Sequence, residues 1–244
     1  MSDFDGRVAL ITGASGGIGQ AISRLLARSG ASVALAYGRN AEPAERLAAS
    51  IEAEGGRAVA LAADLARPES AGELVAAVEA SLGPVDVLVA NAGTAPVQTL
   101  EQVSIGDFDR VLAVNLRAPF LLAQRTVPGM RERGFGRILL MSSVAAFTGG
   151  IVGPHYASSK AGLHGLTHFL ASRTADAGVT VNALAPALIT DTEMLPGEPE
   201  ELRRRVPVGR LGRPEEVADL ALAVLRNGYL TNHVIPIDGG IHAS

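Results

Sequence analysis

The chain has 244 residues, of which 48% are hydrophobic and 28 are glycine, and this composition suits one large α/β core. A net charge of −4 excludes a general affinity for nucleic acid or for anionic membranes, because both need a basic face. The chain has no cysteine, which excludes disulfides, thiolate metal sites and cysteine catalysis, and which suits a reducing compartment.

The N-terminal residues lead from the acidic stretch 1–5 directly into an apolar run, without the basic region and hydrophobic block of a signal peptide. No uninterrupted apolar run approaches the roughly 20 residues that a membrane-spanning helix needs. We therefore expect a soluble cytoplasmic protein with one domain over residues 1–244, and no nucleic-acid or membrane partner.

The first predicted strand, Val8–Thr12, leads into a glycine-rich turn and then a helix. Glycines allow positive φ and close approach of a ligand, and a helix N-terminus offers free N–H groups to a pyrophosphate. The spacing is Gly-x3-Gly-x-Gly instead of the general Gly-x-Gly-x-x-Gly, so a glycine turn without a ligand is the alternative. The candidate cofactor contacts in the turn are Gly13, Ser15, Gly16, Gly17, Ile18 and Gly19.

The second predicted strand, Ser32–Ala36, is followed by Tyr37 and Arg39, where an NAD site would place an acid on the ribose 2′-hydroxyl. No acid occurs before Glu42, and a guanidinium matches a 2′-phosphate. These residues favour NADP(H) over NAD(H), although Arg39 as a solvated loop residue is the alternative and Gly16 supplies no second cation.

Short aliphatic strands alternate with helical patterns along the rest of the chain. The further strands are predicted at 59–62, 85–90, 138–141, 179–184 and 234–237, and the further helices at 43–54, 70–82, about 105–133, 156–177 and 214–225. This alternation predicts an α/β fold, a Rossmann-type doubly wound sheet of seven mainly parallel strands with helices on both faces. Pro119 should kink or break the long third helical stretch just after Asn115. The Pro-rich, charged segment 191–207 is predicted to be a mobile substrate flap.

Polar and small residues follow three of the predicted strands, where an open α/β sheet forms its ligand crevice. They are Asp64 with Leu65, then Asn91, Ala92 and Gly93, and then Ser142 with Ser143. Asp64 can accept from an adenine amino group or can cap a turn, and the two interpretations stay open. The sequence predicts that residues 91–93 lie against a cofactor ribose and that Ser143 holds a substrate oxygen.

Tyr156 and Lys160 are four residues apart, so a helix places them one turn from each other on one face. A free tyrosine has a pKa near 10, and work near neutrality needs about 4 kcal/mol of phenolate stabilisation, more than one exposed cation supplies. The pair therefore requires a partly closed cleft. His155 and His164 lack partners at metal-ligand spacing, and we predict structural or substrate-lining roles for them and no metal site.

These residues together resemble the short-chain dehydrogenase/reductase family over nearly the whole chain. The matching elements, in the order of the family, are Thr12-Gly13-x3-Gly17-x-Gly19, Asp64, Asn91-Ala92-Gly93, Asn115, Ser143, Tyr156-x3-Lys160, Val181-Asn182-Ala183 and Asp238-Gly239-Gly240. The resemblance implies strand order 3-2-1-4-5-6-7, hydride transfer with a nicotinamide cofactor, and usually a homotetramer.

The resemblance also implies roles for individual residues. Tyr156 would be the general acid in carbonyl reduction, Ser143 would bind the substrate oxygen, and Lys160 would lower the tyrosine pKa and hold the nicotinamide ribose. Asn115 would anchor a water that links Lys160 to solvent. The family pattern places Pro186 and Ile189, which follow the sixth strand, at the cofactor.

Within the family the chain is most similar to the 3-oxoacyl-(acyl carrier protein) reductase branch of fatty acid biosynthesis, on the segments 182–186, 209–218 and 238–240. This similarity favours NADPH-dependent reduction of a 3-oxoacyl thioester carried by acyl carrier protein or CoA. Three departures are Ala187 in place of Pro-Gly, an ambiguous Ile-x-Thr segment at 190–192, and Asp176-Ala177 in place of basic residues.

The branch leaves other functions open. Arg131, Arg133 and Arg137 form either a carrier-docking patch or a solvated helix end. The alternatives to the thioester are a small or cyclic ketone, a sugar or a steroid-like substrate. A more remote alternative is a non-catalytic NADP-sensing or scaffold protein, which would not need Asn115 and the other three catalytic residues together.

Overall fold

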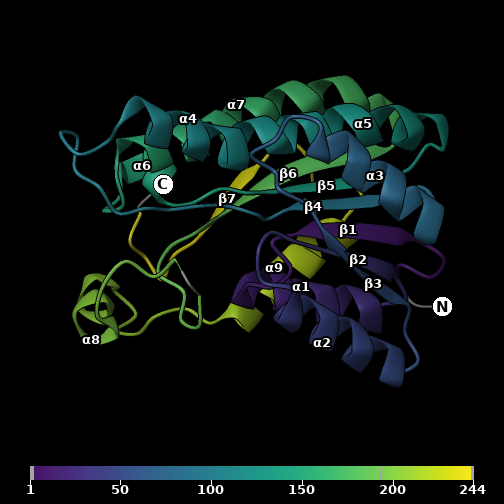
Figure 1. Ribbon diagram of the computed structural model, residues 1–244, viewed down its shortest axis with the longest axis horizontal. Coiled ribbons are helices and arrows are strands. Elements are labelled where there is room, and N and C mark those ends of the chain that lie inside the picture. Colours follow the sequence, from purple (N-terminus) through teal and green to yellow (C-terminus); the bar gives the residue numbers. More distant parts are fainter. Residues whose placement is uncertain (1–2, 193, 243–244) are drawn as a thin grey trace.

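The computed structural model describes residues 3–192 and 194–242. In this part of the chain, seven strands form one sheet in the order β3-β2-β1-β4-β5-β6-β7, and every described pair of neighbours is parallel (Figure 1). The strands are β1 (Val8–Thr12), β2 (Ser32–Tyr37), β3 (Ala58–Ala62), β4 (Val87–Ala90), β5 (Gly136–Met141), β6 (Val179–Pro186) and β7 (Val234–Ile237). The predicted doubly wound fold and strand order are confirmed.

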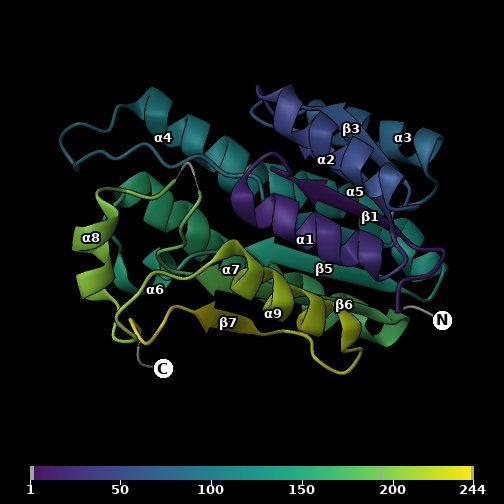
Figure 2. The same ribbon diagram turned by 90° about the horizontal axis from the view of Figure 1, so that it is seen from below.

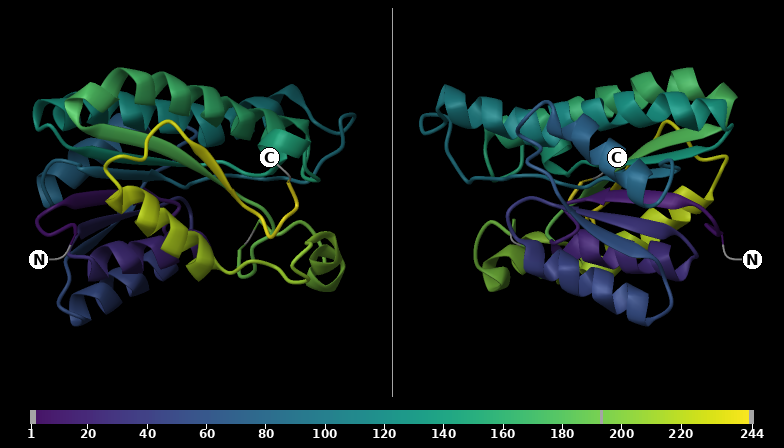
Figure 3. Two further views of the ribbon diagram at one scale, coloured as in Figure 1. Left: turned by 180° about the vertical axis from the view of Figure 1, so that it is seen from behind. Right: turned by 45° about the vertical axis from the view of Figure 1, so that its right-hand side comes forward.

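One helix layer covers each face of the sheet (Figures 1 and 3). The first layer holds α1 (Gly17–Arg28), α2 (Ala41–Ala53) and α9 (Pro214–Arg226), and the second holds α3 (Ser70–Ser81), α4 (Ile105–Leu112), α5 (Ala118–Glu132) and α7 (Pro154–Thr174). Successive strand residues point to opposite faces, so Leu10 and Ile11 enter different cores. Because both faces are covered, the strands read as continuous apolar runs.

The long helix predicted over about 105–133 changes its winding beside Asn115. Residues Ala113–Arg117 form a π-helical turn between α4 and α5, and Pro119 lies in the first turn of α5. Proline has no N–H and its ring clashes with the carbonyl four residues earlier, here that of Asn115, so the helix widens instead of breaking. The sequence predicted correctly that the helix is irregular beside Asn115. The irregularity is a π-helical turn and not the predicted kink or break.

All strands end at one edge of the sheet, and the connections at this edge hold the candidate site. The strand order reverses between β1 and β4, which is where an open α/β sheet forms its crevice. Two short helices, α6 (Ala145–Thr148) and α8 (Pro199–Leu202), also lie at this end of the molecule (Figure 2). The sequence did not predict them, since four residues are too few for a helical period to show.

Candidate active site

The glycine turn between β1 and α1 is packed too closely for side chains. Gly13 has a φ of 65°, and a Cβ on it would lie 2.9 Å from Ala92 Cα. A Cβ on Gly19 would lie 2.2 Å from the carbonyl oxygen of Gly13. Gly19 is buried behind the turn, so the absence of a side chain there allows helix α1 to pack closely on the turn, and its predicted contact with a cofactor stays a prediction.

A threonine at the end of β1 ties the turn to the loop after β4. The hydroxyl of Thr12 accepts from the backbone N–H groups of Asn91 (3.1 Å) and Ala92 (3.0 Å). The side-chain amide of Asn91 donates to the carbonyl oxygens of Thr12 (3.0 Å) and Gly13 (3.2 Å). Asn91 thus holds the backbone of the turn in place, a role that strand-end position alone did not reveal.

A cleft of about 580 Å³ lies beside this turn, over the ends of β1, β2, β3 and β4. The predicted residues that line it are Gly13, Ser15, Tyr37, Arg39, Asp64, Leu65, Ala92 and Gly93. Asp64 also accepts from the backbone N–H of Ala66 (3.1 Å), so it caps its turn while facing the cleft. Arg110 on α4 lines the same cleft and was missed by the sequence, because one exposed helical arginine carries no signal.

The two arginines of the cleft are available to an anion. Among the residues that the structure describes, neither Arg39 nor Arg110 has an ion-pair or hydrogen-bond partner for its guanidinium. The glycine turn has no cation of its own, since residue 16 is glycine. Arg110 instead provides the second cation of the cleft, in addition to Arg39. Guanidinium groups suit phosphate oxygens.

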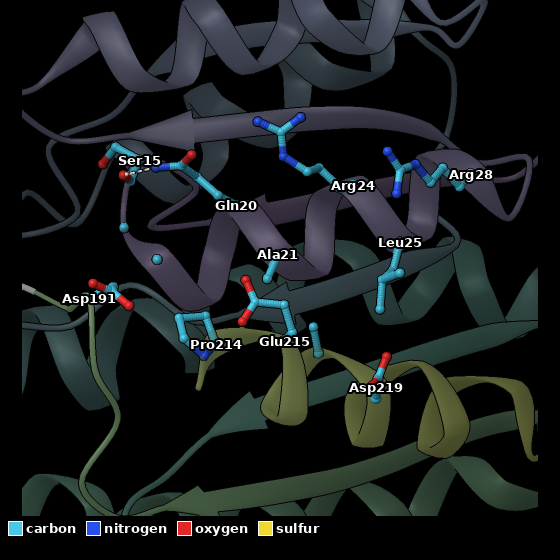
Figure 4. A pocket seen from close by; sticks show the side chains of 13 residues that line it. Ser15, Gln20, Ala21, Arg24, Leu25, Arg28, Asp191, Pro214, Glu215 and Asp219 are labelled. Atoms are coloured by element: carbon cyan, nitrogen blue, oxygen red, sulfur yellow. Dashed lines mark hydrogen bonds between the residues drawn. The ribbon is translucent and has the colours of Figure 1, made fainter. Parts of the chain in front are cut away.

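A separate groove of about 560 Å³ runs between α1 and α9 (Figure 4). It starts at Gly16 and Gly17 and continues past Arg24 and Arg28, away from the residues predicted to be catalytic. Its two arginines already have partners, since Arg24 donates to Ser50 Oγ (3.2 Å) and Arg28 pairs with Glu54 (3.3 Å). The groove is lined by the predicted cofactor residues Ser15, Gly16 and Gly17, and it holds none of the predicted proton donors.

The predicted catalytic side chains meet in a small cavity after β5 and β6. Ser143, Tyr156 and Lys160 line it together with Ile18, Asn91, Pro186 and Ile189, all of which were predicted site residues. Tyr156 is 8% exposed and Lys160 is 2% exposed. Lys160 is one turn after Tyr156 on α7, with its Nζ 5.7 Å from the centre of the tyrosine ring.

Burial shifts the pKa values of both Tyr156 and Lys160. Burial raises the pKa of Tyr156, and a hydrogen bond with Ser143 only partly opposes this shift. Lys160 Nζ donates to the carbonyl oxygen of Met141 (2.7 Å), and burial lowers its pKa to about 8. Desolvation thus dominates the pKa of Tyr156 in the protein alone, and the lowering of this pKa by Lys160 in a cleft closed by cofactor stays a prediction. The phenol holds its proton.

Asn115 is fully buried and joins three segments around the cavity. Its Oδ1 accepts from the N–H of Thr94 (2.8 Å), and its Nδ2 donates to the oxygen of Thr94 (3.0 Å) and to Ser159 Oγ (3.1 Å). A Cβ on Gly93 would lie 3.4 Å from Asn115 Oδ1 and 3.5 Å from Lys160 Nζ. Asn115 and Lys160 thus both lie against Gly93, and the π turn places the amide of Asn115 there, while the water that would link the two residues stays a prediction.

The two threonines of the segment 190–192 differ in their contacts. Asp191 has a φ of 55°, a left-handed conformation that aspartate tolerates better than most residues. The hydroxyl of Thr190 donates to Asp191 Oδ2 (2.9 Å), whereas Thr192 lines the catalytic cavity. The carbonyl oxygen of Asp191 lies 2.4 Å from the position of a Cβ on Gly17, so the start of segment 191–207 packs directly on helix α1.

Two histidines in the middle of α7, His164 and His168, have hydrogen-bond partners. His164 Nε2 is 2.9 Å from Ser142 Oγ, and that hydroxyl donates to the backbone oxygen of Lys160 (3.1 Å). Burial lowers the pKa of His164. His168 Nδ1 is 2.7 Å from Asn232 Oδ1.

The arginines considered for carrier docking lie at the other end of β5. Arg137 is near the start of that strand, whereas Ser143 follows its end, and the strand separates them by about 3.3 Å per residue. Arg133 pairs with Asp86 (3.3 Å), and Arg137 donates to the oxygen of Leu225 (3.0 Å). The structure thus favours a structural role for Arg133 and Arg137.

Three comparisons with known proteins agree with this geometry. The profile of a family described as short chain dehydrogenase matches residues 7–202. Acetoacetyl-CoA reductase of Shinella zoogloeoides is 39% identical, over 96% of this chain and 98% of that protein. L-rhamnose 1-dehydrogenase (NAD(P)(+)) of Sphingomonas sp. is 34% identical, over 100% and 99%. The crystal structure of a blue fluorescent protein from a metagenomic library, in complex with NADPH, superposes with a TM-score of 0.93 at 36% identity, over 99% and 100% of the two chains. In the described residues, no helix is both long and apolar enough to span a membrane.

Proposed function

Because this chain belongs to the short-chain dehydrogenase/reductase family, an oxidoreductase family acting on secondary alcohols and ketones, we propose that it reduces a 3-oxoacyl thioester with NADPH. The observation that carries the proposal is the convergence of Ser143, Tyr156 and Lys160 in one cavity beside the dinucleotide cleft. A relict binding protein would not need this set.

The cleft fits a dinucleotide. The glycine turn leaves the backbone of α1 open at its N-terminus, where a pyrophosphate is favoured by free N–H groups and the helix dipole. Arg39 and Arg110 would face the phosphate groups at the adenosine end of the dinucleotide, and Asp64 would face the edge of the adenine ring. The nicotinamide end would reach Pro186, Ile189 and Thr192. When bound, the reduced nicotinamide supplies the hydride.

The protein's own residues handle the proton. Tyr156, which burial keeps protonated, would donate its phenolic proton to the carbonyl oxygen as charge develops there. Ser143 would donate a hydrogen bond to the same oxygen. Lys160 would stabilise the phenolate that remains, and Asn115 would hold the backbone beside it. Removal of water by the bound cofactor strengthens the effect of Lys160, because a closed cleft has a lower effective dielectric.

The walls of the catalytic cavity support an uncharged substrate group next to the carbonyl. Leu188, Leu195 and Pro196 line it, and among the described residues Lys160 is the cation that reaches it. An acyl chain suits these walls better than a polyol does. The rhamnose dehydrogenase relative keeps a sugar, or another small ketone, as the second candidate. We propose that segment 191–207 closes over the substrate, and that the protein is a cytoplasmic homotetramer.

A substrate panel tests the thioester assignment. We expect NADPH oxidation with acetoacetyl-CoA and an acetoacetyl-carrier protein to exceed that with cyclohexanone, and L-rhamnose with NADP⁺ to give the slowest turnover. The measurement is initial rate by absorbance, compared as kcat/KM. Activity on the sugar or the cyclic ketone without activity on either thioester would reject the thioester as substrate. It would leave the assignment to an oxidoreductase of secondary alcohols and ketones in place.

A charge reversal tests the cofactor preference. In the Arg39→Asp variant, the carboxylate should repel a 2′-phosphate and accept from a ribose hydroxyl, so the kcat/KM ratio of NADPH to NADH should fall by about 10-fold or more. Arg131→Asp, on the exposed helix end far from the cleft, is the matched control and should leave the ratio unchanged. An unchanged ratio in Arg39→Asp would show that Arg39 does not meet the 2′ position.

A further inference from the structure

His155 precedes Tyr156 in the first turn of α7, and its imidazole is fully buried. Its Nε2 is 3.0 Å from Oε1 of Gln98, which lies 57 residues earlier in the connection between β4 and α4. On the premise that Tyr156 is the proton donor of the proposed reaction, we propose that His155 and Gln98 form a clamp that positions Tyr156. His155 is then a positioning residue that acts through its neighbour.

The partners of Gln98 fix which atoms face each other. Its Nε2 donates to Asp107 Oδ2 (3.2 Å), and that carboxylate in turn accepts from the hydroxyl of Ser104 (2.6 Å) at the start of α4. A carboxylate can only accept, so the amide nitrogen of Gln98 faces Asp107 and its oxygen faces His155. His155 therefore carries its proton on Nε2 and donates it to Gln98.

The other side of the imidazole is closed. Within the described residues, His155 Nδ1 is the buried side-chain nitrogen that has no hydrogen-bond partner. A Cβ on Gly153 would lie 3.0 Å from that nitrogen and 2.8 Å from the adjacent Cε1, so the backbone of residue 153 packs directly on the ring. The bond to Gln98 is thus the polar contact that sets the orientation of the imidazole. An unpartnered buried nitrogen costs stability, so a role beyond packing accounts better for a histidine here.

The clamp connects to the wall of the catalytic cavity. The backbone N–H of Gln98 donates to the oxygen of Val152 (2.9 Å), which adds a second link between the two segments. Val152, Ala145 and Tyr156 form one buried cluster, and Ala95 from the Gln98 segment packs against it. The segment 95–98 is therefore held over the tyrosine at both of its ends. Loss of the clamp would free the first turn of α7 against Ser143.

The effect on turnover should be large, because displacement of a reacting group by about 1 Å can cost about 100-fold in rate. In the His155→Leu variant, which keeps size and removes the donor, we expect kcat to fall about 10-fold or more while the KM for NADPH changes less than about two-fold. His155→Gln, whose amide nitrogen can replace Nε2, should restore most of the turnover. Amide hydrogen exchange over residues 94–104 should be faster in His155→Leu than in His155→Gln.

A double variant and a reference variant separate the possible outcomes. Gln98→Leu should lower kcat as much as His155→Leu does. The double variant should have a kcat no lower than that of the poorer single variant, because either substitution alone already breaks the hydrogen bond between the two side chains. Additive losses, or equal turnover and exchange in His155→Leu and His155→Gln, would overturn the clamp. Tyr156→Phe is the reference variant. If it keeps full turnover, the assignment of Tyr156 as the proton donor is wrong. If it loses turnover while His155→Leu keeps the native rate, the clamp is rejected and the proton donor is retained.

Discussion

Turnover of the Tyr156→Phe variant should fall by about three orders of magnitude, while its affinity for NADPH stays within about two-fold of that of the native protein. The change removes one oxygen from a side chain that is 8% exposed, so the packing of the ring is kept. A positioned general acid contributes about 10²- to 10⁴-fold to rate, and no other phenol or thiol in the described cavity can replace it. The measurements are steady-state kinetics and fluorescence titration of NADPH.

The control for this variant is Tyr229→Phe. Tyr229 is 97% exposed. It lies in the connection that leads from α9 into the amino end of β7, whereas the site lies at the carboxyl ends of the strands, so its phenol should have no effect on turnover. Turnover that survives in Tyr156→Phe at more than about one tenth of the native rate would assign the proton to another group, with Ser143 as the next candidate.

The Lys160→Met variant should lose at least about 100-fold in kcat, because the cation that stabilises the phenolate is gone. Its thermal stability should nevertheless equal or exceed that of the native protein. Burial lowers the pKa of Lys160 from 10.5 to about 8, so the charged side chain is destabilising by roughly 3 kcal/mol at neutral pH. Methionine at position 160 removes this destabilisation. The loss of the hydrogen bond to the carbonyl oxygen of Met141 destabilises the variant by only about 1–3 kcal/mol. A large drop in melting temperature would show that Lys160 is mainly structural.

The same shift gives a pH dependence with a definite sign. Between about pH 8 and 10.5 the unfolded chain binds the lysine proton and the folded chain does not, so the free energy of unfolding should rise with pH in this window. Above pH 10 the raised pKa of Tyr156 acts in the opposite direction, because the folded protein keeps a proton that the unfolded chain loses. The rise is therefore expected from about pH 8 to 10, and Lys160→Met should lack it.

Lys160 is the single lysine of the chain, since the other 20 basic residues of the 21 Lys and Arg are arginine. Arginine stays charged in proteins, whereas lysine shifts its pKa when buried, so the one lysine stands where a tunable cation is needed. This makes the pKa directly measurable: in protein grown with ¹³Cε-lysine, one NMR resonance should titrate near pH 8 without cofactor. A midpoint near 10.5 would contradict the burial argument.

The sequence predicted the parts of the site that depend on short spacings and on strand direction. The structure brings the Tyr156 and Lys160 pair together with the residues after β4 and β5, because parallel strands have their carboxyl ends on one side of the sheet. Strand direction also separates Arg137 from Ser143, since Arg137 comes at the beginning of β5 and Ser143 comes after its end.

Contacts between distant segments were beyond the reach of the sequence. The hydrogen bond between His155 and Gln98 and the bonds of Asn115 to Thr94 join residues 57 and 21 positions apart, and no periodicity encodes them. Spacing also does not show that the ammonium of Lys160 donates to Met141, or that burial raises the pKa of Tyr156. Desolvation depends on the assembled core, which a local pattern does not contain.

The central claim is that the cleft transfers a hydride from NADPH to a carbonyl while Tyr156 supplies the proton. The most direct test is mass spectrometry of the alcohol formed from acetoacetyl-CoA, or from the best ketone of the panel, with NADPH deuterated at the transferring C4 position. The native protein should place one deuterium on the carbinol carbon, and Tyr156→Phe, with NADPH bound, should form the labelled alcohol about 1,000-fold more slowly. Labelled alcohol formed at equal rates by both proteins, or no labelled alcohol from any carbonyl, would contradict the account.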